Sequence, residues 1–330
     1  MANLKFINPT SGRFRNACYA NAIAQVLASA PMISDYFRSK GYQDKSNDSP
    51  VSYEFSRILG QQGQSSTGQL REVVGVSSDK GYFYDGTQQD AAEFLRELIT
   101  SLLKECSSDD QGTLQNFFKG MLTYQRGFLE TPNGSCDSCG TFVNPQDETF
   151  YILDLPSRSS SSPSIQSLIN NNYEVIEMQC PNTACMDKTN KKAGQSKVIV
   201  QLPSILFITI AKDFQLKFNG YELEDSIDLQ GMTYQLVGLV DHLGNTTRSG
   251  HYIAWKKVNF QWYKCDDNIV HEVSQNVIPG YNNYLFVYLK KQLHETHINV
   301  SQIIPHHQFP SHQGNLFCFK KKKVNNQHMD

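Results

Sequence analysis

The order of two kinds of apolar pattern along the chain constrains its fold more than any other feature. Apolar residues recur every three or four positions in residues 19–30 and again from about Gln89 to Glu105, as in amphipathic helices. After about residue 113 the apolar runs are short and alternate with polar residues, which is typical of strands. Helices followed by strands favour an α+β architecture over alternating βαβ units.

The segments can be placed more closely. Pro31 ends the pattern of residues 19–30, a short helix is expected around Tyr53–Leu59 within the polar stretch 41–85, and Thr87 is a suitable N-cap for the second strong helix. The expected strands are Met121–Phe128, Phe150–Leu155, Lys197–Gln201, Ile205–Ile210, Tyr234–Asp241, His251–Val258, Gln261–Lys264 and Tyr284–Lys290.

Composition indicates a soluble globular protein, with 39% hydrophobic and 19% charged residues among 330. The formal net charge of −2 gives no reason to expect bulk binding to nucleic acid or to an anionic membrane. The N-terminus lacks the long apolar core of a secretory signal, and the longest apolar stretch, near Leu202 to Ala211, is too short to span a bilayer. We therefore expect a cytoplasmic or nuclear location, where disulfides are rare.

Cys18 stands at the start of the first predicted helix. A thiol is a useful nucleophile only as a thiolate, and both a helix N-terminus and a nearby charged histidine favour that form. Free cysteine is also a common small apolar residue of protein cores. The local sequence leaves both interpretations of Cys18 open.

His251 follows Gly250 at the start of a predicted strand, and Asp266 ends the next one. An antiparallel hairpin of these two strands would bring Asp266 beside His251, where the carboxylate could hold the imidazole through its second nitrogen. A cysteine, a histidine and a carboxylate in this order are the parts of a cysteine hydrolase. The alternative is a surface histidine with two solvated aspartates, Asp266 and Asp267.

Four of the eight cysteines form two close pairs in the strand-rich half. Cys136 and Cys139 are separated by two residues, and Cys180 and Cys185, 41 residues after the first pair, by four. Two such pairs at two hairpin tips can supply four thiolates to one structural Zn²⁺. A redox pair and unrelated free thiols are the alternatives, although no thioredoxin-like βαβ context accompanies the first pair.

The last segment, residues 293–330, has a different composition. It carries several histidines and the basic run Lys320–Lys323. This run is typical of a nuclear-import or anion-binding segment, and a solvated flexible tail is the other interpretation.

Taken together, these motifs resemble the ubiquitin-specific proteases, which are papain-like cysteine peptidases that remove ubiquitin. The resemblance covers roughly residues 10–291. The matching segments are Asn16–Asn21 for the cysteine box, Gly86–Leu95 for the Gln-Gln-Asp box, Gly250–Ala254 with Trp262–Asp267 for the histidine box, and Leu202–Phe207 with Tyr284–Tyr288 for two landmark strands.

The resemblance implies an α+β catalytic domain over residues 1–292, with a helical thumb over about 1–112 and zinc-bearing fingers and a palm over about 113–292. It implies a deubiquitinating thiol protease that cleaves after the C-terminal glycine of ubiquitin. Cys18 would be the nucleophile, His251 the base and acid, and Asp266 the orienting carboxylate, with Asp267 as the second choice. The residues that would contact the ubiquitin tail are Gln89, Asp90, Glu93, Gly250 and Tyr252.

The chain departs from the family pattern near the nucleophile. The family has an asparagine five residues before the catalytic cysteine, where it donates to the oxyanion, and Arg13 holds that position here. An arginine could also donate there. Two further functions therefore stay open: an inactive ubiquitin-binding module, and a protease for a ubiquitin-like modifier.

Overall fold

The computed structural model describes residues 4–40, 42, 47–156, 163–171, 173–210, 222–246, 249–278, 280 and 282–291. Residues Met1–Lys291 form one compact unit. The tail 293–330, with its basic run, lies outside the described residues. In the described part of the chain, no helix is long and apolar enough to cross a membrane.

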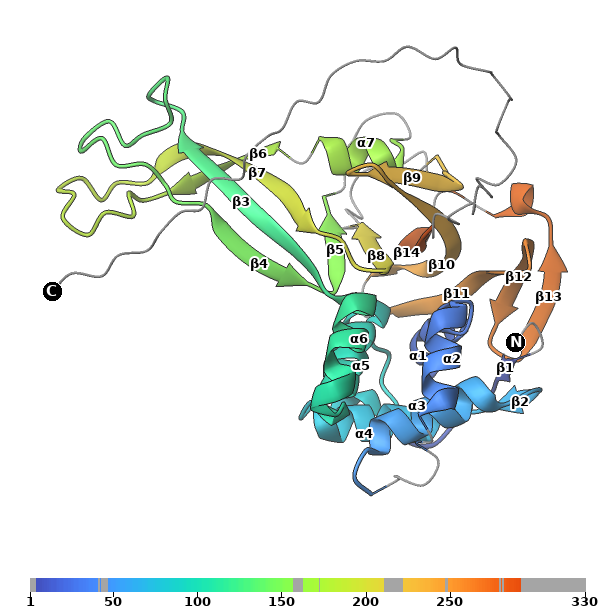
Figure 1. Ribbon diagram of the computed structural model, residues 1–330. Coiled ribbons are helices and arrows are strands. Elements are labelled where there is room, and N and C mark those ends of the chain that lie inside the picture. Colours follow the sequence, from blue (N-terminus) through green and yellow to red (C-terminus); the bar gives the residue numbers. More distant parts are fainter. Residues whose placement is uncertain are drawn as a thin grey trace, which may run out of the picture. The chain divides into compact units, whose positions relative to one another are not determined.

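Helices fill most of the described chain before residue 120 (Figure 1). They are α1 (Cys18–Leu27), α2 (Pro31–Ser39), α3 (Pro50–Gly60), α4 (Gly68–Ser77), the 3₁₀ helix η2 (Gly81–Phe83), α5 (Ala91–Glu105) and α6 (Ser108–Phe118). The helices α1, α3 and α5 were predicted, whereas α2, α4 and α6 were not. Pro31 ends one pattern as expected, but it also begins α2, because its fixed φ and missing N–H suit the first turn of a helix.

The predicted N-cap of α5 is wrong. Asp90, in an extended conformation, caps the helix, and its Oδ1 accepts a hydrogen bond of 2.8 Å from the Glu93 N–H. Thr87 instead donates its own N–H to Asp85 Oδ1 at 2.7 Å in the preceding turn. Asp at the N-cap satisfies a free N–H and places a negative charge at the positive end of the helix dipole.

Strands make up two main sheets in the described residues after 119. In the larger sheet the order is β13 (Ile269–Val273), β12 (Gln261–Asp266), β11 (Ser249–Val258), β10 (Met232–Thr246), β14 (Asn283–Lys290), β8 (Ile205–Ile210) and β5 (Ile152–Leu155), with β9 (Ser226–Leu229) also paired to β10. In the smaller sheet the order is β4 (Gln146–Phe150), β3 (Gly120–Phe128), β7 (Lys191–Gln201) and β6 (Tyr173–Met178). The remaining elements are β1 (Lys5–Phe6), β2 (Gln64–Ser65), α7 (Ile165–Asn170) and η3 (Gln275–Val277).

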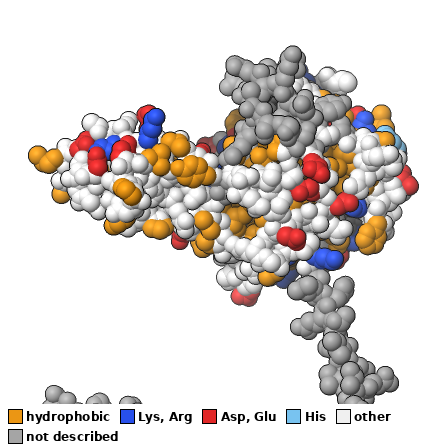
Figure 2. All heavy atoms as spheres, turned by 90° about the horizontal axis from the view of Figure 1, so that it is seen from above, with side chains coloured by type: hydrophobic (Ala, Val, Ile, Leu, Met, Phe, Trp, Pro, Cys, Tyr) orange, Lys and Arg blue, Asp and Glu red, His pale blue; other side chains and the backbone are white. Residues whose placement is uncertain are grey.

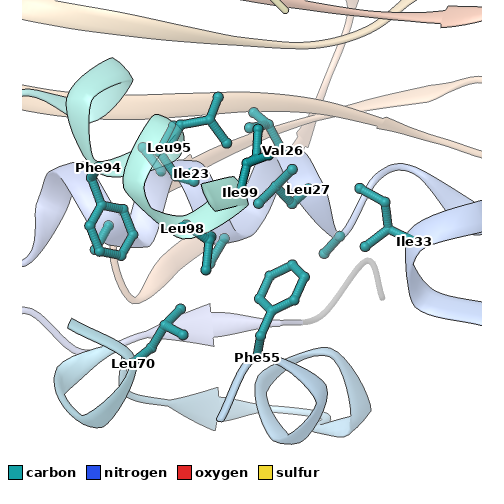
Figure 3. Packing of buried hydrophobic residues seen from close by; sticks show 14 of the residues in the cluster. Ile23, Val26, Leu27, Ile33, Phe55, Leu70, Phe94, Leu95, Leu98 and Ile99 are labelled. Atoms are coloured by element: carbon teal, nitrogen blue, oxygen red, sulfur yellow. The ribbon is translucent and has the colours of Figure 1, made fainter. Parts of the chain in front are cut away.

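The larger sheet is buried on both faces, so its strand β8 is buried at every position. In β8, Ile205 and Phe207 belong to the core shared with the helices, whereas Leu206 and Ile208 belong to a second core that includes α7. This division follows the twofold alternation of side chains along a strand. In the first core, apolar residues of α5 pack over those of α1, α3 and α4 (Figure 3).

Helix α1 lies against β10, β11 and β12, and all of its residues are buried. Gly238 of β10 permits this close approach, since a Cβ there would lie 3.2 Å from a methyl group of Val26. The first residue of α1 is thereby held against the strands that carry the predicted histidine and aspartate.

Candidate active site and cysteine cluster

Cys18 is the first residue of α1 and is 4% exposed. The preceding turn contains Asn16 at a φ of +54°, a conformation that costs energy for most residues but less for asparagine. Asn16 Nδ2 holds this turn by donating to the Gly86 carbonyl at 2.9 Å. The N–H of Ala17, next to the thiol, donates to Asn8 Oδ1 at 2.8 Å. The position of Cys18 is therefore fixed by two hydrogen bonds between side chains and backbone that join its turn to two other segments.

Arg71 of α4 supports the same turn from the protein interior. Its side chain is fully buried, and its guanidinium donates to the carbonyls of Phe14 (2.8 Å), Arg15 (3.2 Å) and Phe83 (2.7 Å). Its Nε also donates to the Tyr19 hydroxyl at 2.8 Å. A buried cation is costly unless its donors are satisfied, and here carbonyl dipoles satisfy them. Residues 14–16 are consequently held rigidly just before Cys18.

His251 and Asp266 meet as the predicted hairpin requires. In the β11–β12 pair Ala254 lies opposite Cys265, and Nε2 of His251 lies 2.6 Å from Asp266 Oδ1. This contact leaves Nδ1 as the nitrogen available to a thiol. The Cys18 side chain raises the pKa of His251 to about 9 by hydrogen bonding; burial opposes this rise and the Asp266 carboxylate adds to it. The three predicted side chains are thus brought together.

Gln88 links the histidine strand to the helical layer. Its Oε1 accepts a hydrogen bond of 2.8 Å from the Gly250 N–H. Gly250 itself is tightly enclosed, since a Cβ there would lie 2.5 Å from His242 Nε2. The short segment from Gly86 to Gln88 therefore binds both the turn before Cys18 and the backbone before His251.

The four paired cysteines meet as predicted. Their sulfur atoms all lie within 4.8 Å of one another, with Cys136 and Cys185 4.0 Å apart and Cys139 and Cys180 3.6 Å apart. These separations exclude S–S bonds, which are about 2.05 Å long. Four thiolates bound at about 2.3 Å around a tetrahedral ion would be about 3.8 Å apart. The cluster therefore fits a single structural metal ion.

The match to a protein-family model identifies the family of this chain. Residues 13–288 match the model of the family described as "Ubiquitin carboxyl-terminal hydrolase". The chain belongs to this family. This match confirms the resemblance that the sequence motifs indicated. The members of this hydrolase family are deubiquitinases.

Individual relatives are distant. The chain is 24% identical over 322 residues to ubiquitin carboxyl-terminal hydrolase Usp2 of Drosophila melanogaster, a match covering 83% of this chain and 34% of that protein. It is also 24% identical over 307 residues to ubiquitin carboxyl-terminal hydrolase 17-like protein D of Mus musculus, covering 84% and 53%. The chain thus spans about a third to a half of the length of these relatives.

Solved structures of the family share the fold. A SAGA DUB module of Ubp8, Sgf11, Sus1 and Sgf73 bound to monoubiquitin matches with a TM-score of 0.64 at 18% identity, over 88% of this chain and 70% of that one. The same module bound to ubiquitin aldehyde matches with a TM-score of 0.62 at 19% identity, over 88% and 70%. The predicted α+β papain-like fold with a cysteine-bearing fingers sheet is therefore confirmed.

Two of the residues expected to contact the ubiquitin tail, Gln89 and Tyr252, instead contact other residues of the protein. Gln89 Nε2 donates to the Tyr82 carbonyl at 3.2 Å, and Tyr252 is only 5% exposed, with its ring 4.5 Å from that of His242. Asp90 and Glu93 line an open cleft of about 540 Å³ between α5 and the sheet. The acidic pair thus faces accessible space, whereas Tyr252 belongs to the core.

The expected oxyanion role of Arg13 finds no support in its contacts. Its guanidinium forms a bidentate pair with Glu72 of α4, with both N–O distances 3.0 Å, and its side chain is 56% exposed. Asn8 lies much closer to the nucleophile through its bond to the Ala17 N–H. Counting five residues back from Cys18 misses Asn8, because it precedes the cysteine by ten positions.

Asp267 does not contact the imidazole through a hydrogen bond in the described structure. Its two carboxylate oxygens accept from Asn8 Nδ2 and Asn21 Nδ2, each at 2.8 Å. Asp267 therefore ties α1 and the N-terminal segment to the end of β12. Asn21 and Gln88 lie in motif segments but were given no role. Asn8 and Arg71 were not singled out from the sequence, because isolated polar residues carry no periodic signal.

Protonated His251 should stabilise the folded protein at low and neutral pH. Its folded pKa of about 9 lies above the value of about 6.5 for an unfolded histidine. This contribution is therefore full below about pH 6.5 and is lost as the pH rises through about 9. The difference in urea midpoint between the parent and His251→Gln should shrink over that range. His271→Gln, on the exposed strand β13, is the control. A difference that grew with pH would contradict the assignment.

Proposed function

We propose that this unit is an active deubiquitinase that hydrolyses the peptide or isopeptide bond after the C-terminal glycine of ubiquitin. The observation that carries the proposal is the joining of Cys18, His251 and Asp266 within a family of ubiquitin hydrolases. In the proposed domain, residues 1–292, the helices form the thumb and the two main sheets form the palm and fingers.

The chemistry follows from the side chains. The Cys18 thiolate attacks the glycine carbonyl, and a C–S bond forms while the carbonyl becomes an oxyanion. His251 then gives its proton to the departing amine, the C–N bond breaks, and an acyl-enzyme remains. His251 next takes a proton from water, whose oxygen attacks the thioester and releases ubiquitin. Asp266 keeps the imidazole oriented throughout.

We assign the oxyanion donor to Asn8 in place of Arg13. Asn8 Nδ2 carries two hydrogens, and one of them is used by Asp267. Its Oδ1 is fixed by the N–H of Ala17, directly before the nucleophile. We infer that the second Nδ2 hydrogen reaches the oxyanion, because Asn8 is held against the residue that precedes Cys18, and a donor there stabilises the developing charge.

Surface character supports ubiquitin as the substrate. SAGA DUB modules with the same fold are solved with bound ubiquitin. In the present chain the smaller sheet carries apolar side chains that face solvent, and Figure 2 shows such side chains over this part of the molecule. They include Tyr173 and Val175 of β6 and Val198 and Val200 of β7, which are 38–54% exposed. An exposed apolar patch of this kind marks a protein-binding surface.

Zinc is the metal we propose for the cysteine cluster, since four thiolates in tetrahedral arrangement are the preferred structural zinc ligands. Bound there, zinc would crosslink the hairpin tips and would supply no chemistry to the active site. The residues that would hold it are Cys136, Cys139, Cys180 and Cys185.

Cleavage of ubiquitin carrying a C-terminal fluorophore tests the activity. Replacing the nucleophile by Cys18→Ala should lower the rate by at least about 10,000-fold. Cys106→Ala, a thiol that lies beside Tyr36, is the matched control and should retain activity. Folded protein that binds ubiquitin without turnover would instead indicate a binding module. Turnover of only a ubiquitin-like modifier would change the substrate.

The oxyanion assignment predicts opposite results for two variants. Asn8→Ala should lower kcat about 100- to 1000-fold, whereas Arg13→Ala should stay near the parent rate. Alkylation of Cys18 by iodoacetamide involves no oxyanion, so it reports whether the thiol is still correctly placed in Asn8→Ala. Equal kcat values for the two variants would reject Asn8 as the donor.

Metal content tests the cluster. The purified protein should contain about one zinc per chain by mass spectrometry, and Cys139→Ser or Cys180→Ser should reduce this content and lower the thermal midpoint. Cys106→Ser should retain the metal. Unchanged zinc content in the two cluster variants would exclude these thiols as ligands.

A further inference from the structure

Lys80 enters the acidic cleft lined by Asp90 and Glu93, the two acidic residues that the family resemblance assigns to the basic C-terminal tail of ubiquitin. The cleft is lined by four carboxylates, those of Asp90, Glu93, Glu97 and Asp154, and by the two cations Lys80 and Arg96. Lys80 Nζ lies 2.9 Å from Glu93 Oε1 and 2.9 Å from Glu97 Oε1. These two glutamates are four residues apart on α5 and therefore share a face.

The other carboxylates of the cleft are also partnered. Asp90 Oδ1 caps α5, and its Oδ2 accepts from the Tyr284 hydroxyl at 2.5 Å. Asp154 accepts from Arg96 at 2.8 Å through both oxygens. The Tyr82 hydroxyl adds a donor to Glu93 Oε1 at 2.5 Å. Every carboxylate of this cleft thus already receives a hydrogen bond from the protein itself.

Backbone hydrogen bonds fix the position of Lys80, and its carboxylate partners keep its ammonium charged. Its N–H donates to the Gly75 carbonyl at 2.7 Å, and its carbonyl accepts from Phe83 at 3.1 Å. Hydrogen bonding to Glu97 is the largest cause that raises the pKa of Lys80 above its usual range, so the ammonium stays charged. An incoming cation consequently meets two glutamates that already share one resident ammonium, so their negative charge is half balanced.

We propose that Lys80 is a specificity-determining residue, a resident cation that competes with the basic substrate tail for Glu93 and Glu97. This inference rests on the proposed function. The Lys80 side chain is 30% exposed, so its ammonium can turn into water when displaced. Displacement favours a tail group that makes several charge-assisted hydrogen bonds at once over one that offers only a point charge.

Ubiquitin binding to two charge-matched variants tests the proposal. In the full chain with Cys18→Ala, fluorescent ubiquitin should bind Lys80→Met about three- to tenfold more tightly than the parent at low salt, because one cation no longer competes. The gain should shrink as salt screens the cleft. Lys104→Met removes the same charge from α5, where the ammonium donates to the Ser77 carbonyl, and should leave the affinity unchanged.

The outcomes separate this proposal from the proposed function. Weaker binding by Lys80→Met, with an unchanged thermal midpoint, would mean that Lys80 holds Glu93 in place for the substrate and would overturn the competition. Equal affinities for the parent and Lys80→Met would also overturn it. Binding of ubiquitin by neither protein would reject the proposed function, and this inference with it.

Discussion

The burial of α1 against the larger sheet is the interaction on which the site depends. This helix carries Cys18 at its first residue, and the sheet carries His251 and Asp266. Apolar contact alone would allow the helix to slide, but Asn21 donates to Asp267 and Gln25 accepts from Lys256 at 2.6 Å. Buried polar groups are costly when unpaired, so these bonds select one register of helix on sheet.

A second constraint concerns the backbone before the nucleophile. The turn at Asn16 needs a positive φ. The carbonyls of Phe14 and Arg15 point into the interior, where they accept hydrogen bonds from the Arg71 guanidinium. The segment from Gly86 to Gln88 then joins this turn to the strand of His251. The placement of Cys18 and His251 thus depends on hydrogen bonds between the backbone of these segments and the side chains of Asn16, Arg71 and Gln88.

A third feature is the distribution of charge in the acidic cleft between α5 and the larger sheet. The four carboxylates that face the cleft are partly balanced by two cations, Arg96 of α5 and Lys80, which lies between Glu93 and Glu97, and they also accept hydrogen bonds from hydroxyls. Such balance limits repulsion among the acidic groups while the cleft is empty. A cation that entered the cleft would have to replace these partners, so the net free energy of its binding would be smaller than the number of carboxylates suggests.

The sequence alone determined the features that repeat or lie close together. Helical spacing located α1 and α5, strand alternation located β8 and the β11–β12 hairpin, and that hairpin brought Asp266 to His251 because neighbouring antiparallel strands fix their own register. Only the tertiary structure decided the rest. The polar composition of residues 68–77 hid α4, the N-cap fell on Asp90, and Asn8 and Arg71 reached the nucleophile from distant positions. Such contacts depend on how whole elements pack, and a single polar residue leaves no local pattern from which its partner could be read.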